Sequence, residues 1–147
     1  MREFKVINYT SQDGLTLYAR DYALKNGTDT RPVVLCMHGL TRNSADFEPL
    51  MPHLTDKYRC LVVDQRGRGQ SDYDNNTANY TPPTYAQDMF TLLDHLHIQY
   101  VNIIGTSMGG IIGMLMAAMQ PSRIATLVLN DIGPEVPVDA LNRLKKY

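Results

Sequence analysis

Short apolar runs alternate with amphipathic stretches along the 147 residues of the chain. Phe4–Tyr9 and Leu15–Tyr22 alternate in part between apolar and polar positions, and the Asp13-Gly14 step between them favours a hairpin turn. Further along, continuous apolar runs of strand length are typical of strands buried on both faces. We predict such strands at Val33–Met37 and Cys60–Val63, a short β-branched strand at Val101–Ile104, and a last buried strand at Ala125–Leu129.

Helical spacing appears between these runs. Asn43–His53 predicts a short helix, with two prolines that limit its regularity. Thr84 and Gln87 form a capping-box pattern, after which the apolar positions share one helical face and Asp88 falls on the polar side. The apolar positions are Tyr85, Met89, Leu92, Leu93 and Leu96. Gly109–Gln120 is apolar nearly all round, which predicts a buried helix.

This order of elements predicts an α/β fold. A hairpin that leads into alternating strands and helices favours a mostly parallel sheet with helices on both faces. Residues Arg66–Pro83 are rich in Gly, Asn, Asp and Pro, so we expect a long loop there. The length fits one domain, and residues 1–147 contain no repeat, low-complexity tract or domain boundary.

Composition narrows the range of partners. A formal charge of −1 gives no electrostatic argument for nucleic acid or for an anionic membrane surface. Cys36 and Cys60 lie inside apolar runs and are interpreted as buried free thiols in a reducing compartment, although two cysteines can also pair. The first residues lack the apolar core of a signal peptide. We therefore expect a cytoplasmic protein, with neither a cofactor nor a bound metal.

The uncharged segment Val101–Met119 could be mistaken for a membrane helix with a glycine dimerisation motif. The order of its residues argues against one continuous helix, because a β-branched run is broken by Gly105–Gly110 before the apolar pattern resumes. No cluster of Lys or Arg flanks it. We predict a strand, a tight turn and a buried helix.

The turn itself contains candidate chemistry. Gly105-Thr106-Ser107-Met108-Gly109 matches G-x-S-x-G between a predicted strand and a predicted helix, the context of a nucleophile elbow. The glycines are needed because the backbone passes close to itself on either side of the strained serine. The turn exposes Ser107 at a helix N-terminus, where free N–H groups favour a developing negative charge. The alternative is a tight turn with an incidental serine.

Two more motifs make that alternative weak. The first buried strand ends in His38-Gly39-Leu40, and the second ends in the D-x-R-G-x-G-x-S pattern of Asp64–Ser71. With the elbow, these motifs resemble the α/β-hydrolase family, in its cap-bearing small-molecule branch. They occur in the family's order, each after a strand, and the resemblance covers nearly the whole chain. It implies an α/β-hydrolase sheet that stops after about six strands, with a cap segment beginning near residue 132.

The resemblance assigns roles to particular residues. Ser107 is the expected nucleophile, and the backbone N–H groups of Leu40 and Met108 are the expected oxyanion hole. His38 resembles the family's structural histidine, which shapes the oxyanion loop, rather than a general base. Asp64 and Arg66 are expected to brace the following loop as a pair, while Gly67 and Gly69 permit its turns. His53, His95 and His97 are interpreted as surface residues.

The sequence departs from the family after Ser107. A serine nucleophile needs a base and an orienting acid, which in this fold follow the serine in the order acid, then histidine. No histidine follows Ser107 within these residues. The acid usually follows the next strand, beyond residue 147, although some members place it where Asp131 stands here. We favour a turn role for Asp131 over the role of triad acid.

Leu141–Tyr147 resembles the interior of a helix, so we expect residues 1–147 to be the N-terminal part of a hydrolase domain. Such a part would leave the Ala125–Leu129 strand without its outer neighbour and invite pairing with another chain. The expected assemblies are self-association or a complex with the missing C-terminal half.

Two functions fit these motifs. The first is a serine hydrolase that acts on small apolar esters, amides or C–C diketones, with residues 1–147 inactive alone because the histidine is missing. The second is a non-catalytic small-molecule-binding protein that keeps the pocket and lacks the triad. A histidine after two further strand patterns in a longer gene would favour the first function.

Overall fold

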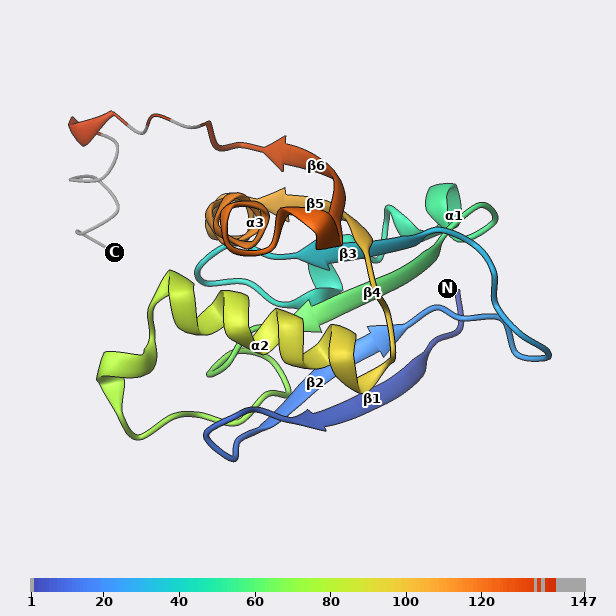
Figure 1. Cartoon of the computed structure of the whole chain (residues 1–147), viewed down its shortest axis with the longest axis horizontal. Coiled ribbons are helices and arrows are strands. Elements are labelled where there is room, and N and C mark those ends of the chain that lie inside the picture. Colours follow the sequence, from blue (N-terminus) through green and yellow to red (C-terminus); the bar gives the residue numbers. More distant parts are fainter. Residues whose placement is uncertain (1, 134, 136, 140–147) are drawn as a thin grey trace.

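A six-stranded sheet forms the centre of the chain (Figure 1). The computed structural model describes residues 2–133, 135 and 137–139. Strands follow the order β1-β2-β4-β3-β5-β6 across the sheet. Their bounds are β1 Lys5–Thr10, β2 Thr16–Asp21, β3 Val33–Met37, β4 Arg59–Asp64, β5 Val101–Thr106 and β6 Ile124–Asn130. β3, β4, β5 and β6 are parallel, whereas β1 and β2 form an antiparallel hairpin that adds to β4.

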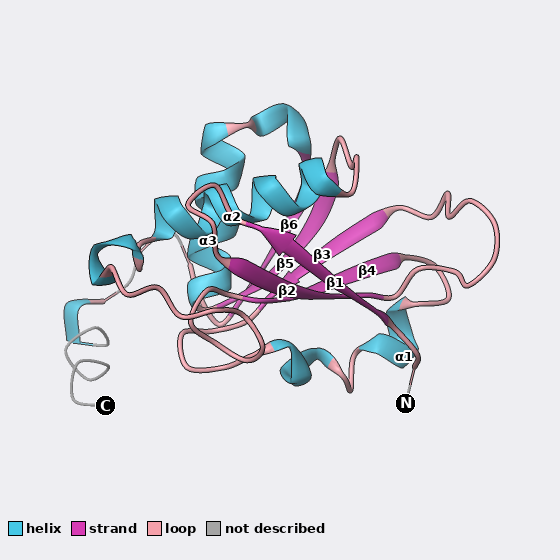
Figure 2. Cartoon of the chain, turned by 90° about the horizontal axis from the view of Figure 1, so that it is seen from below, coloured by secondary structure: helices cyan, strands magenta, loops and turns pink. Residues whose placement is uncertain are grey.

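Helices cover both faces of this sheet (Figure 2). The α-helices are α1 Met51–Leu54, α2 Pro82–His95 and α3 Met108–Met119, and the 3₁₀ turns are η1 Ser44–Phe47, η2 Thr77–Asn79 and η3 Pro121–Arg123. α2 and α3 pack on one face over the larger apolar cluster, while η1 and α1 cover the smaller one. The two clusters use alternate residues of the same strands, since Leu35 and Leu61 point to one and Cys36 and Val62 to the other. The predicted mostly parallel α/β sheet is confirmed.

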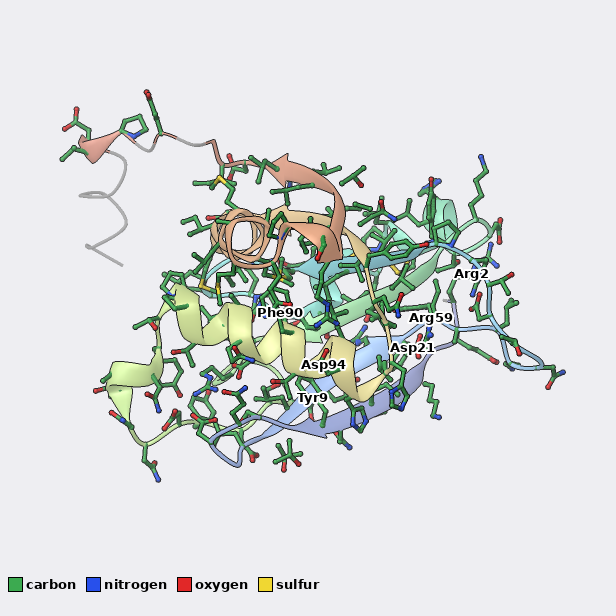
Figure 3. All side chains as sticks on the ribbon, in the orientation of Figure 1. Arg2, Tyr9, Asp21, Arg59, Phe90 and Asp94 are labelled. Carbon is green, nitrogen blue, oxygen red and sulfur yellow. The ribbon has the colours of Figure 1, made fainter. Side chains whose placement is uncertain are left out.

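A part-buried ion pair joins β2 to β4 at one end of the sheet. The Asp21 carboxylate on β2 accepts two hydrogen bonds from the Arg59 guanidinium on β4, at 3.0 and 2.6 Å. Figure 3 shows both side chains at the end of the sheet where β4 begins, away from the carboxyl ends of the parallel strands.

β6 differs from the prediction of a buried strand. It pairs only with β5 in the described part of the chain, and Ala125, Thr126, Val128 and Asn130 are exposed. Burial on both faces needs a layer packed on each face, and the described residues cover β6 only in part. A hollow of about 620 Å³ lies beside it on the α1 face, lined in part by Phe47, Leu50, Ile104 and Val128.

The start of α2 also differs from its prediction. The expected capping box at Thr84 and Gln87 is wrong, because the helix begins at Pro82, three residues before the start that an N-cap at Thr84 implies. Proline fits the first helical turn, where its missing N–H costs no hydrogen bond. Thr81 is the N-cap residue, and its hydroxyl lies 3.0 Å from that of Thr84. The predicted helix at 43–53 is divided into η1 and α1.

α3 confirms the strand, turn and helix expected from residues 101–119. No helix of the described chain combines the length and apolarity needed to cross a membrane. The inner side of α3 is buried through Ile112 and Met116, but Ala118 and Met119 are exposed, so the expectation of burial all round is wrong. Cys36 and Cys60 are buried free thiols, as predicted. The helix expected at 141–147 lies outside the described residues, as does most of the expected cap segment.

Candidate active site

The carboxyl ends of three neighbouring parallel strands bring the motifs together. β3 lies between β4 and β5, so the segments that follow these strands meet at one edge of the sheet. They contain Gly39-Leu40 after β3, Gln65–Ser71 after β4 and Ser107 after β5. Ligands of open α/β sheets bind at this edge.

Ser107 occupies a strained turn between β5 and α3. Its φ of 51° and ψ of −114° lie outside the helical and extended regions. The turn is tight enough that a Cβ on Gly105 would overlap the Gly109 carbonyl, and one on Gly109 would overlap the Met37 carbonyl. The Ser107 N–H donates to the Asn130 carbonyl at 2.9 Å, which ties the turn to β6. These contacts hold the serine in a conformation that few residues adopt.

The loop after β3 lies directly against this serine. A Cβ built on Gly39 would be 3.6 Å from the Ser107 Cβ, so the absent side chain lets the loop approach. Within the described residues, neither the Leu40 N–H nor the Met108 N–H has a hydrogen-bond acceptor. Met108 begins α3, whose N-terminal dipole adds partial positive charge beside Ser107.

His38 fixes the peptide that carries the Leu40 N–H. Its Nε2 accepts a hydrogen bond from the Gln65 N–H at 3.0 Å, so Nδ1 carries the proton and donates to the Gly39 carbonyl at 2.7 Å. In a trans peptide the Gly39 carbonyl and the Leu40 N–H point in opposite directions. His38 is completely buried, which lowers its pKa. Both ring nitrogens are therefore engaged with the backbone, and neither is free to take a proton from Ser107.

Asp64 braces the next loop through the backbone. Its Oδ1 accepts from the Ser44 N–H at 2.7 Å and its Oδ2 accepts from the Gln70 N–H at 2.8 Å. Gly69 has a φ of 53°, and a Cβ there would overlap the Asp64 carboxylate. Asp64 does not pair with Arg66, so the expected bracing pair is wrong. Each residue braces the loop separately.

Arg66 is the centre of a buried charge cluster. Its guanidinium, 1% exposed, binds Asp88 through Nε and Nη2, both at 2.7 Å, and also reaches Asp13 and Asp74 at 2.8 Å. The Arg66 hydrogen bonds lower the pKa of Asp13 to about 2, whereas burial raises the pKa of Asp88. The sequence pattern predicts Asp88 on the polar face of its helix, but in the structure its side chain is buried. The cluster joins the β1–β2 turn, the loop and α2.

Arg68 contacts the loop after β3, although it occupies an unspecified position of its motif. Its Nε donates to the Leu40 carbonyl at 3.0 Å, and its Nη1 donates to the Arg66 carbonyl at 2.9 Å and to the Tyr85 hydroxyl at 3.0 Å. The guanidinium lies 5.4 Å from the Tyr85 ring centre and 5.7 Å from that of Tyr80. An x position of the D-x-R-G-x-G-x-S pattern thus holds the loop after β3, which the motif alone does not reveal.

The other candidate residues lie apart from this group or at its edge. His53, His95 and His97 are exposed, as expected. Asp131 directly follows β6 with a φ of 56°, and its exposed carboxylate has no hydrogen-bond partner among the described residues. The described chain contains no group of three side chains suited to a metal ion.

Comparisons with known proteins agree with this architecture. Residues 32–147 match the family model described as alpha/beta hydrolase fold, and the chain belongs to this family. A solved α/β hydrolase from Novosphingobium aromaticivorans is 46% identical, with a TM-score of 0.91 over all of this chain and half of that one. The solved E-2-(acetamidomethylene)succinate hydrolase is 32% identical, with a TM-score of 0.84 over 98% of this chain and 50% of that one.

Among curated relatives, the 3-hydroxybutyrate-oligomer hydrolase of Cupriavidus necator is 40% identical over 78% of this chain and 39% of its own length. The 2-(acetamidomethylene)succinate hydrolase of Mesorhizobium japonicum is 36% identical over 78% of this chain and 40% of its own. The chain thus spans about half of the solved relatives and two fifths of the curated ones. These relatives support membership in a family of hydrolases.

Proposed function

We propose that this chain is the nucleophile-bearing part of a serine hydrolase and that Ser107 is its nucleophile. The observation that carries the proposal is the strained backbone of Ser107 at the junction of β5 and α3. Strain of this kind costs free energy and persists where the surrounding structure holds it, most often at functional sites.

The neighbouring groups suit acyl transfer. Ser107 Oγ attacks a carbonyl carbon, and the negative charge that develops on the carbonyl oxygen is stabilised by the N–H groups of Leu40 and Met108. The leaving group departs with a proton, and water then releases the acid from the acylated serine. The proposed substrates are small apolar esters, amides or C–C diketones. Several relatives are named for hydrolysis of a succinate derivative, hydroxybutyrate oligomers or an enol-lactone.

The base that this reaction needs is not supplied by the histidines of this sequence. His38 is engaged through both ring nitrogens, and His53, His95 and His97 are exposed surface residues. We propose that the base comes from polypeptide beyond these 147 residues. A left-handed φ is a conformation that aspartate readily adopts in turns, so we keep the turn role for Asp131 and propose that the orienting acid also lies beyond these residues. The free buried thiols support a reducing, cytoplasmic location.

A fluorophosphonate ester tests the nucleophile, since it forms a stable adduct with an activated serine. The longest natural polypeptide that carries this sequence should be labelled once, on the peptide that contains Ser107. Ser107→Ala should abolish the adduct, and Ser122→Ala, at an exposed serine, should leave it unchanged. Absence of the adduct, or labelling of another residue, would refute the hydrolase and favour the non-catalytic binding protein. Asp131→Asn should slow labelling if Asp131 orients the base and leave the rate unchanged if it only forms a turn.

A further inference from the structure

One arginine differs from its counterparts in charge pairing. Within the described part of the chain, every other arginine has a carboxylate within ion-pair distance: Arg2, Arg20, Arg31, Arg42, Arg59, Arg66 and Arg123. Arg68 has none there, and its hydrogen bonds go to two backbone carbonyls and a tyrosine hydroxyl. Its positive charge is thus left without a neutralising anion.

The side chain is nevertheless held in place. Nε is bound to the Leu40 carbonyl, Nη1 to the Arg66 carbonyl and the Tyr85 hydroxyl, and Tyr80 and Tyr85 lie within cation–π distance. In the described chain Nη2 has no acceptor, so its N–H groups are available to a ligand. A guanidinium that is already ordered loses little conformational entropy when it binds an anion.

Its position relates this charge to the reacting serine. Arg68 follows β4, Leu40 follows β3 and Ser107 follows β5, and these strands are neighbours in the order β4-β3-β5. The Arg68 Nε lies 3.0 Å from the Leu40 carbonyl, and a Cβ on the preceding Gly39 would lie 3.6 Å from the Ser107 Cβ. Arg68 and Ser107 therefore flank the same short loop, so an acyl group on Ser107 can extend past Leu40 toward Arg68.

We propose that Arg68 is a specificity-determining residue, which binds a carboxylate borne by the acyl part of the substrate. The substrate class is then a half-ester or other acyl derivative of a short dicarboxylic acid, with an apolar spacer between the two ends. The proposal rests on the proposed function and adds to it the end of the substrate remote from the reacting carbonyl. Arginine suits this role because its fork of N–H donors matches a carboxylate.

A matched pair of ligands tests the charge preference in the longest natural polypeptide that carries this sequence. Monomethyl adipate carries one carboxylate, and dimethyl adipate has the same length without charge. Nuclear magnetic resonance titration should show the monoester shifting the Arg68 Nε–Hε and Leu40 N–H signals, with a Kd at least about tenfold below that of the diester. Raising the salt concentration from about 0.05 to about 0.5 M screens charge–charge attraction, so it should weaken binding of the monoester and leave binding of the diester unchanged.

Variants separate Arg68 from its surroundings. Arg68→Met should remove the preference for the monoester, and Arg68→Lys should keep part of it. Arg42→Met removes a nearby arginine that is already paired with Asp46, and should keep all of it. Equal affinity for the two ligands in the unchanged protein, or equal loss in both Met variants, would overturn the proposal. Neither result depends on the fluorophosphonate adduct, so the failure of Ser107 as nucleophile would be seen separately.

Discussion

The Arg66 guanidinium and the Asp88 carboxylate form a two-bonded ion pair inside the protein, with both N–O distances at 2.7 Å. Arg66 is 1% exposed and Asp88 3% exposed in their side chains. Arg66→Met would leave Asp88 buried without its partner, and we expect a loss of about 3–5 kcal/mol in the free energy of unfolding. Urea denaturation followed by circular dichroism measures this loss.

The double variant Arg66→Met/Asp88→Leu is the control for that prediction. It removes the uncompensated charge together with its partner, so it should recover part of the lost stability. A double variant less stable than Arg66→Met alone would show that the cluster acts through packing rather than charge.

The turn around Ser107 predicts a steric effect at Gly109. Gly109→Ala places a Cβ against the Met37 carbonyl, a backbone group that cannot move aside by a change of rotamer. We expect a loss of about 1–3 kcal/mol or more in stability. Gly133→Ala is the matched control, because the nearest atom to a Cβ there is 3.9 Å away. Thermal melting of both variants tests the prediction, and equal melting temperatures would contradict it.

Burial of His38 predicts a dependence of stability on pH. Because burial lowers its pKa in the folded state, the unfolded chain binds a proton more readily. The stability is complete above the unfolded pKa of about 6.5 and falls as the pH drops through that value toward the folded pKa. His38→Asn should flatten this part of the curve, whereas His53→Asn, at an exposed histidine, should not. Urea midpoints at pH 7.5 and 5.5 provide the comparison.

The histidine positions predict very low turnover for these 147 residues alone. Without a base near Ser107, only binding and the oxyanion hole remain, which typically give about 10³–10⁴-fold acceleration over water. Purified protein should hydrolyse p-nitrophenyl acetate barely above background, and Ser107→Ala should change this little. Robust hydrolysis that Ser107→Ala abolishes would show that a base is present within the chain or comes from a second copy.

The exposed strand β6 predicts association. Its residues include Val128, 53% exposed, next to the hollow on the α1 face. An unpaired edge with apolar side chains favours pairing with another chain. Light scattering after size exclusion should therefore detect oligomers or aggregates, and Val128→Lys should reduce them. A monodisperse monomer with a cooperative melting transition would contradict this expectation.

Much of the fold could be predicted from periodicity. The continuous apolar run at 33–37 became β3, because a strand covered on both faces needs apolar residues on both sides. The β-branched run at 101–104 became β5, in which burial alternates and Asn102 is half-buried. Apolar composition could not show that β6 is half exposed, since burial depends on the layer packed on each face rather than on the run itself. The start of α2 was missed because the threonine pattern was preferred over the two prolines that fit its first turn.

The parts of the candidate site that lie within sequence motifs could be predicted from the sequence. The structure places Ser107 on a strained turn with Gly39 against it, as the G-x-S-x-G and His-Gly patterns suggest. Asp88 and Arg68 were missed because their partners, Arg66 and Leu40, are distant in sequence. A carboxylate at a polar helical position and an arginine at an unspecified motif position give no local signal of such contacts.

The two buried thiols can report local opening of the protein on the α1 side of the sheet. Burial raises the pKa of Cys36 strongly and that of Cys60 to about 11, so near pH 8 neither forms much thiolate in the folded protein. Because thiolate is the form that alkylates, iodoacetamide reacts when the small apolar layer beneath α1 opens. Cys36 lies on the central strand β3 and Cys60 on its neighbour β4. The alkylation rates of the two cysteines therefore report how often this side of the sheet becomes exposed to solvent.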